Sequence, residues 1–327
     1  MLQIIPKISL LNAEKEFEKV ISGIELRGYI NKPPVSVTGG IQWDLAEEKI
    51  KSLSIDDITN IFCPSRRDIY MKRVLKIKGS KNWGRVTGQL VESCMFGFAD
   101  KYKDNISINR VRTYESLSKK ANLFMADFSK KNKKEVAELT KFKNSPGEDE
   151  DLLLRQLNYA LRYELIMLRA TRKLSGNKSG SEVIPHMKIE PNTKILGISS
   201  PSTPDFVIPG LSAIGDIKTG FEFKDYYRLA AAGYALAYEN QKGVGNDINL
   251  GLIYYFPTRK KDISFAHLYI FVIDDTLRQE FLDMRDKALL VMKEAFSVSK
   301  TVPALAELDK HCIYCKYRSE CDKSRRK

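Results

Sequence analysis

The sequence predicts an α/β fold in which helices flank a mixed β-sheet. From residue 182 onward, short apolar segments typical of strands are interrupted by one helix and then continue, which is the order expected of an α/β core. Pro209-Gly210 separates two such segments and predicts a turn between paired strands. With 327 residues, the chain is long enough to bury a sizeable core as one large domain or two modest ones.

Residues 1–62 are expected to form an N-terminal segment of helix and extended chain. An apolar stripe predicts an amphipathic helix from Ile8 to Ile24. Two adjacent prolines exclude a helix from Tyr29–Gly40, which is expected to be a loop or an edge strand. Ser54 is placed to cap a short helix that leads into Cys63.

Residues 63–104 are expected to hold this cysteine and the first core helix, which is predicted over Trp83–Tyr102 from its buried apolar periodicity. A helical insertion over residues 105–180 follows. It contains a lysine-rich helical stretch, Lys119–Lys143, and a long leucine-rich helix that begins after the acidic run at Glu148 and ends at Ser175.

Residues 181–300 are expected to form the sheet and the helices that cover it. Apolar character in short windows predicts six strands: Val183–Glu190, Lys194–Gly197, Asp205–Ile208, Ala213–Lys218, Leu250–Phe256 and His267–Ile273. Longer periodic stretches predict two helices, Asp225–Asn240 and Asp275–Ser297. The remaining segment, residues 301–327, is a tail that carries three of the five cysteines.

The composition favours a protein that works on a polyanion. Lys and Arg total 54 against 41 Asp and Glu, a net charge of +13, which is typical of nucleic-acid binding. Lysine enrichment is also common in proteins of hyperthermophiles. No apolar run approaches the roughly 18 to 20 residues that span a bilayer, and the N-terminus lacks a basic-then-apolar leader. A cytoplasmic protein without a membrane anchor is therefore expected.

The cysteines indicate a metal centre that joins the two ends of the chain. Cys312, Cys315 and Cys321 form a C-x2-C-x5-C pattern, and a tight turn between paired thiolates aims both sulfurs at one metal. Cys63, which precedes a basic helix, is the best candidate for the fourth ligand. The spacing fits tetrahedral zinc as well as an iron–sulfur cluster. Cys94 is left over and is expected to be a buried thiol.

A second candidate site is made of carboxylates. The predicted hairpin brings Asp205 near Asp216, and strand alternation places Asp216 and Lys218 on one face with Ile217 in the core. Two carboxylates, the carbonyl of Ile217 and water would suit Mg2+ or Mn2+, while Lys218 would balance charge or hold an attacking water. Ordinary charged residues at the end of a hairpin explain the same spacing, because D-x-K triplets also occur by chance.

Pro204-Asp205, Asp216-x-Lys218 and the following helix with Tyr234 resemble the PD-(D/E)xK nuclease motifs of the RecB family. Together with the four cysteines, they resemble the CRISPR-associated RecB-like exonucleases that carry a [4Fe-4S] cluster, in their archaeal type I-A variant. The resemblance implies a restriction-endonuclease-like core with a helical insertion and an iron–sulfur region. It also implies an Mg2+- or Mn2+-dependent DNA exonuclease that acts on single-stranded or frayed ends, beside integrase proteins, to prepare fragments for CRISPR spacer acquisition.

Carried over by position, Asp205 and Asp216 would be metal ligands and Lys218 the catalytic lysine. The cluster would be held by Cys63, Cys312, Cys315 and Cys321, so the resemblance favours [4Fe-4S] over zinc. Two positions depart from the family pattern. Glu92 stands where a histidine is common, although a carboxylate also ligates hard metal ions. Ala230 stands where a glutamine usually lies four residues before Tyr234, which is expected to contact DNA or metal-bound water, or to be a core tyrosine.

These departures leave an alternative function open. If they weaken catalysis, the chain is a weakly active or inactive DNA-end-binding scaffold of the adaptation machinery. Two basic patches are candidate phosphate contacts in either case, although each is equally explained as a solvated face. The patches are Arg66, Arg67, Lys72 and Arg73 after the first cysteine, and Lys316, Arg318, Arg325 and Arg326 in the tail.

Overall fold

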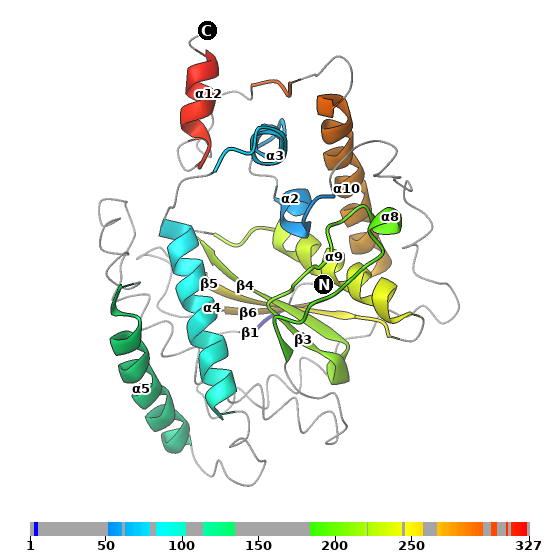
Figure 1. Cartoon of the computed structure of the whole chain (residues 1–327). Coiled ribbons are helices and arrows are strands. Elements are labelled where there is room, and N and C mark those ends of the chain that lie inside the picture. The colour runs from blue at the N-terminus through cyan, green and yellow to red at the C-terminus, as the bar shows by residue number, and fades with distance from the viewer. Residues whose placement is uncertain are drawn as a thin grey trace.

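The computed structural model is an α/β protein with one mixed sheet, shown in Figure 1. It describes residues 3–5, 52–60, 63–78, 83–102, 114–134, 184–220, 222–243, 246–257, 267–296, 302–305, 312 and 315–325. The predictions for residues 8–24, 29–40 and the leucine-rich helix after Glu148 lie outside these ranges. None of the helices among the described residues is long and apolar enough to cross a membrane.

Six strands of the described chain form the sheet in the order β1-β6-β5-β4-β3-β2. Their bounds are β1 Gln3–Ile5, β2 Ile184–Pro185, β3 Phe206–Ile208, β4 Ala213–Gly220, β5 Leu250–Pro257 and β6 His267–Val272. Only the β4–β5 pair is parallel; the other neighbours are antiparallel. Parallel strands need a crossover connection, and helix α9 (Tyr226–Lys242) supplies it.

Helices α9 and α10 (Asp275–Phe296) cover one face of the sheet. In Figure 1 they lie above the strands and to the right, while α4 (Trp83–Tyr102), which contacts β4, and α5 (Tyr114–Lys131) lie at the left of the sheet. Helix α2 (Ile55–Thr59) packs on both α9 and α10. The predicted helices Trp83–Tyr102, Asp225–Asn240 and Asp275–Ser297 are confirmed within two residues at each end.

The core lies mainly between the sheet, α9 and α10. The side chains of α9 from Leu229 to Glu239 are buried, which leaves only the ends of this helix at the surface. Gly233 permits the close approach of α10, because a Cβ at this position would come within 2.4 Å of the Phe281 ring. This close packing fixes α9 against the sheet and so fixes any side chain that it directs toward β4.

Two predicted strands were wrong. Residues 194–197, predicted as a strand, fall largely in a short helix, α8 (Thr193–Leu196), which ends at Gly197 with a φ of 66°. A segment of four residues with two apolar side chains, Ile195 and Leu196, fits a helical turn as well as a strand, so the pattern could not decide. The strand predicted over Val183–Glu190 is reduced to β2, because His186 has a φ of 47° and turns the chain away.

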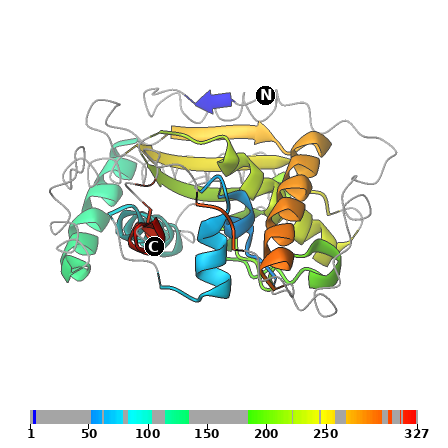
Figure 2. The same cartoon turned by 90° about the horizontal axis from the view of Figure 1, so that it is seen from above.

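Strand β1 was not predicted. Its three residues pair with β6 in antiparallel register, with Ile4 opposite Tyr269. Seen from above in Figure 2, β1 forms the outer edge of the sheet beside β6. The described part of the lysine-rich helix begins at Tyr114, five residues before the predicted start, and forms α5 on the outside of α4.

Candidate functional site

The ribbon formed by β3 and β4 positions the predicted carboxylates and lysine. Phe206, the first residue of β3, pairs with Gly215, where a Cβ would overlap the Phe206 ring. This pairing places Asp205 beside the centre of β4, where its Oδ2 accepts the N–H of Ile217 at 2.5 Å. Ile217 itself, predicted to lie in the core, is only half-buried; its pairing partner is Tyr254 of β5, whereas β3 pairs with β4 only as far as Gly215.

Asp216 and Lys218 occupy one face of β4, as strand alternation requires. The Lys218 Nζ lies 2.5 Å from the Asp216 Oδ2, and Asp216 is only 3% exposed. Asp205 is hydrogen-bonded to Asp216. The structure therefore brings Asp205, Asp216 and Lys218 together at one point on the ribbon.

The charges of this group are strongly coupled. Burial, the Asp216 charge and the hydrogen bond with Asp216 raise the pKa of Asp205 well above its usual value. Burial alone would lower the pKa of Lys218, but the charges of Asp216, Asp56 and Asp205 outweigh it and raise this pKa. Lys218 is therefore a permanent cation among carboxyl groups that resist being ionised together.

Tyr234 of α9 closes the site from the helical layer. Its side chain is buried, and its pKa is raised well above the usual value by burial and then by the charges of Asp56, Asp216, Asp205 and Glu92. Tyr234 thus faces these carboxylates, although the residues around it also belong to the hydrophobic core. The two predicted roles, a site residue and a core tyrosine, are compatible in this position.

Asp56 was missed from the sequence. It lies in the first turn of α2, is exposed, and contributes to the raised pKa values of both Lys218 and Tyr234. In the sequence it looked like one of two acids that stabilise a helix N-terminus. Only the packing of α2 on α9 shows that it belongs beside β4.

Glu92 lies at the edge of the site on α4. Its Oε1 is 3.5 Å from the Nδ1 of His186, and both side chains are partly exposed. The imidazole of His186 also meets the Phe96 ring edge-on, with 4.4 Å between the ring centroids. Glu92, which stands where the family commonly has a histidine, therefore lies beside a histidine from another part of the chain, His186. No local sequence pattern identified this histidine.

Three carboxyl groups, Asp56, Asp205 and Asp216, thus act on the ammonium group of Lys218, and Glu92 acts with them on Tyr234. In the described part of the chain, no three His, Cys, Asp or Glu side chains stand close enough together to hold a metal ion on their own. The adjoining pair, Asp205 and Asp216, offers the hard oxygen donors that Mg2+ and Mn2+ prefer. The donor chemistry fits such an ion, with the remaining ligands drawn from the backbone, water or substrate.

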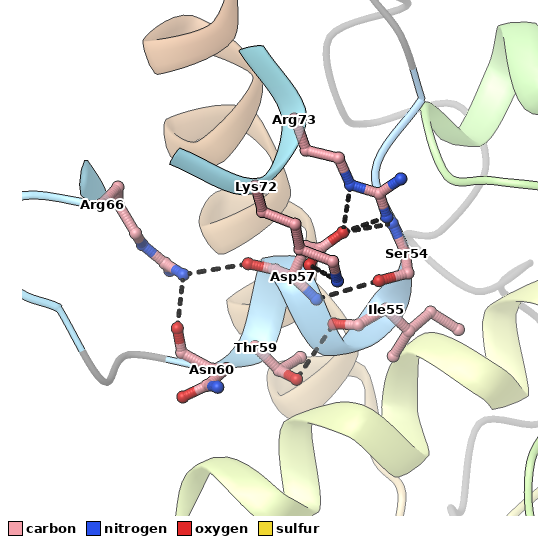
Figure 3. Close-up of polar contacts among 8 residues, drawn as sticks. All are labelled: Ser54, Ile55, Asp57, Thr59, Asn60, Arg66, Lys72 and Arg73. Atoms are coloured by element: carbon pink, nitrogen blue, oxygen red, sulfur yellow. Dashed lines mark hydrogen bonds and ion pairs between the residues drawn. The ribbon is translucent and has the colours of Figure 1, made fainter. Parts of the chain in front are cut away.

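The residue after Asp56 has a different role, shown in Figure 3. Asp57 is buried, and its Oδ1 accepts a hydrogen bond from the Lys72 Nζ at 2.6 Å while its Oδ2 accepts one from the Arg73 Nε at 2.7 Å. Asp57 and Ser54 also form a capping box at the start of α2. Burial would raise the pKa of Asp57, but the hydrogen bonds and charges of Lys72 and Arg73 outweigh it and lower this pKa.

The four residues of the first basic patch therefore donate hydrogen bonds within the protein, and two of them, Arg66 and Arg67, are buried, whereas Lys72 stays exposed. Arg66 is only 6% exposed, and its guanidinium donates to the carbonyl oxygens of Asp57 and Asn60 (Figure 3). Arg67, 9% exposed, donates to the carbonyl oxygen of Pro303 at 2.5 Å and to the Ser324 Oγ at 3.3 Å. The sequence showed the positive charges, but it could not show that backbone oxygens and Asp57 take up their hydrogen bonds.

Arg67 also joins the Cys63 segment to the tail. Ser324 belongs to α12 (Arg318–Arg325), the helix that contains Cys321, and Figure 1 shows α12 at the same end of the molecule as α3 (Arg67–Ile69). Burial raises the pKa of Cys315, and the charges of Cys321, Asp68 and Cys63 add to this rise. The charges of two other predicted cluster ligands, Cys63 and Cys321, thus act on Cys315. Cys312 is linked through its backbone, whose carbonyl accepts the N–H of Cys315 at 3.2 Å.

Cys94 is separate from this group. Its thiol is fully buried 3.6 Å from the Met125 Sδ, between α4 and α5, and burial raises its pKa. This environment agrees with the predicted structural role.

Comparison with known proteins identifies the family. A segment of 138 residues is 32% identical to the CRISPR-associated exonuclease Csa1 of Saccharolobus solfataricus, over 42% of this chain and 44% of that protein. The chain thus matches a little less than half the length of this relative. The profile of the family described as CRISPR-associated exonuclease Csa1 matches residues 1–321. The chain therefore belongs to the CRISPR-associated exonuclease Csa1 family.

Proposed function

We propose that this protein is a metal-dependent DNA exonuclease that trims or degrades DNA ends for CRISPR spacer acquisition. The observation that carries the proposal is the convergence of Asp205, Asp216 and Lys218 on one ribbon, with Asp56, Glu92 and Tyr234 facing them. Such an excess of carboxylates around one lysine favours the binding of a compensating cation. The α/β architecture supports a restriction-endonuclease-like core, and the family supports a nuclease of the CRISPR system.

In this proposal Asp205 and Asp216 hold Mg2+ or Mn2+, with the carbonyl of Ile217 as a further donor. A bound divalent ion polarises the scissile phosphate and makes bound water more acidic. Lys218, kept protonated by its neighbours, holds the attacking water or neutralises the charge that develops on the phosphate. Asp56 and Glu92 supply outer carboxylates that orient water, and Tyr234 limits access from the helical layer. The substrate is DNA with a single-stranded or frayed end, delivered to CRISPR integrase proteins.

The test measures cleavage of end-labelled single- and double-stranded DNA by anaerobically purified protein with Mg2+ or Mn2+. We expect metal-dependent shortening of the labelled strand by the wild type and a loss of about a hundredfold or more in Lys218→Met. Lys242→Met, an exposed lysine at the far end of α9, is the matched control and retains activity. Equal cleavage by the wild type and Lys218→Met would reject the site. Tight DNA-end binding without cleavage would support the scaffold function instead.

We further propose that Cys63, Cys312, Cys315 and Cys321 hold a [4Fe-4S] cluster. The interaction of Cys315 with Cys63 and Cys321, and the bridge from Arg67 to the tail, support a shared centre. Four thiolates accept zinc equally well, so the metal must be measured. We expect anaerobically purified protein to contain iron and sulfide and to absorb visible light, and Cys315→Ala to lose this absorbance and unfold at lower temperature. Cys94→Ala is the control; stoichiometric zinc in place of iron would disprove the cluster.

A further inference from the structure

Aromatic side chains gather beside Lys218, at the end of β4. Four of the seven residues from 221 to 227 are aromatic, and three of them, Phe223, Tyr226 and Tyr227, are described and only half-buried. They contact Tyr255 of β5 and Tyr269 of β6, and His267 lies next to Tyr269. The aromatic cluster is defined here as these six residues: Phe223, Tyr226, Tyr227, Tyr255, His267 and Tyr269.

The rings form a continuous surface rather than isolated contacts. Phe223 stacks on Tyr269 with 4.0 Å between ring centroids and an interplanar angle of 25°. Tyr227 meets Phe223 edge-on at 5.5 Å and Tyr226 at 4.9 Å. Tyr255 is the buried base of the cluster, and its hydroxyl donates to the Gly220 carbonyl at 2.7 Å, which fixes the end of β4. The other five residues each retain partly exposed surface.

The cluster borders the nuclease residues directly. The Lys218 Nζ lies 5.9 Å from the centroid of the Tyr227 ring, so one ammonium group faces both Asp216 and the aromatic surface. Lys224 lies within the same loop, and its charge and that of Lys218 both act on Tyr226. Core packing alone does not require five partly exposed rings next to cations, because aliphatic side chains would fill the same space.

Aromatic faces beside lysines are the combination that binds single-stranded DNA. Each base presents a flat π-surface that stacks on an aromatic side chain, while ammonium groups attract the adjoining phosphates. A duplex hides these base surfaces in its own stack, so the same surface discriminates against paired DNA. The overall charge of +13 complements such a strand.

We propose that the aromatic cluster binds the unpaired bases of a single-stranded DNA end and holds the adjoining phosphate beside Lys218. The inference rests on the proposed nuclease site and adds to it a basis for preferring single-stranded over paired ends. Phe223, Tyr226 and Tyr227 provide the accessible rings, and Tyr255 and Tyr269 support them from the sheet. The cluster acts in binding and positioning, whereas Lys218 and the carboxylates act on the phosphate.

The experiment measures DNA binding in EDTA, so that no cleavage is needed. A short single-stranded oligonucleotide with 2-aminopurine at its end is titrated with wild type, Phe223→Leu and Tyr226→Leu. We expect the wild type to quench the fluorescence by stacking, and each variant to lose quenching and bind about tenfold more weakly. Tyr226→Trp, which keeps an aromatic ring at this position, is expected to retain both the fluorescence quenching and the affinity of the wild type. Phe296→Leu, which changes a partly exposed ring at the end of α10, is the matched control and behaves as wild type.

A strand whose terminal nucleotides are abasic separates stacking from a structural effect. If the rings bind bases, the wild type and Tyr226→Leu bind this strand equally. A variant that weakens binding to both strands by the same factor would overturn the proposal, as would unchanged quenching in Phe223→Leu and Tyr226→Leu. If binding depends on the rings but no metal supports cleavage, the proposal for the aromatic cluster is kept and the proposed nuclease function is rejected. If cleavage depends on metal but binding does not depend on the rings, only the proposal for the aromatic cluster is rejected.

Discussion

Asp56 and Asp57 are neighbours on α2, yet the structure places them in opposite electrostatic environments. Asp57 is buried between Lys72 and Arg73, so its charge is fully compensated and its pKa is lowered. The charge of Asp56 acts on Lys218 together with the charges of Asp216 and Asp205, and in this group negative charge exceeds positive charge and the pKa of Asp205 is raised. The charges of Asp57, Lys72 and Arg73 compensate one another within the protein, and we call them the balanced group. The carboxyl groups around Lys218 keep an excess of negative charge that a bound cation would compensate, and we call them the unbalanced group.

The largest expected effect comes from removing charge at the unbalanced group. Asp216→Asn should lower metal-dependent DNA cleavage at least about a hundredfold, because a carboxylate ligand for the divalent ion is lost. It should also remove the rise in melting temperature that Mn2+ causes in the wild type. Calorimetry with and without Mn2+ and a cleavage assay measure the two effects. Retention of the full Mn2+ shift in Asp216→Asn would show that the ion binds elsewhere.

Removing charge at the balanced group should act on stability. Asp57→Asn should lower the free energy of unfolding by about 2 to 4 kcal/mol at neutral pH, since Lys72 and Arg73 lose a buried partner although both remain partly solvated. The lowered pKa means that this stabilisation is present above the unfolded-state pKa and is lost as the pH falls through the folded-state pKa. The difference between wild type and variant should therefore shrink in acid, as urea denaturation at several pH values will test.

Asp56→Asn is the matched partner of Asp57→Asn. Because Asp56 is exposed, the free energy of unfolding of the Asp56→Asn variant should differ from that of the wild type by less than about 0.5 kcal/mol. Cleavage should fall about tenfold, which corresponds to about 1.4 kcal/mol of transition-state stabilisation, if this outer carboxylate orients water near the metal. Equal cleavage by Asp56→Asn and the wild type would show that α2 contributes no residue to the nuclease site.

The smallest effect, and one of opposite sign, is expected for Asp205→Asn in metal-free protein. A carboxyl group with a raised folded-state pKa destabilises the protein increasingly as the pH rises from its unfolded-state pKa toward its folded-state pKa. Replacing it should therefore slightly raise the melting temperature in EDTA at neutral pH, while removing the response to Mn2+. A lower melting temperature in EDTA would show that the hydrogen bond to Ile217 outweighs the repulsion from Asp216.

Long periodic segments made much of the fold predictable. Helices α4, α9 and α10 and strands β4 and β5 lie where the sequence predicts, because each contains enough residues for its period to be counted. The convergence of Asp205 on Asp216 also followed from a local hairpin. Short segments were ambiguous, as α8 shows, since its two apolar residues satisfy both the helical and the strand period.

What remained hidden depends on partners that are distant in the sequence. The pairing of β1 with β6 joins residues 3–5 to residues 268–270, and nothing near Gln3 specifies that partner. Arg66 and Arg67 looked like a DNA-binding patch because their acceptors are mainly backbone oxygens, which sequence composition does not reveal. Asp56 could be assigned to the site only after α2 was placed on α9.

The bridge from Arg67 to Ser324 has a consequence for biogenesis. A nascent chain presents Arg67 long before its acceptors at Pro303 and Ser324 have left the ribosome, so these contacts are complete only after the 257 residues that follow Arg67, up to Ser324, have been synthesised. Until then, the guanidinium group of Arg67, which is buried in the finished protein, remains hydrated. Closure of this end of the molecule is thus timed by the synthesis of the segment around Ser324.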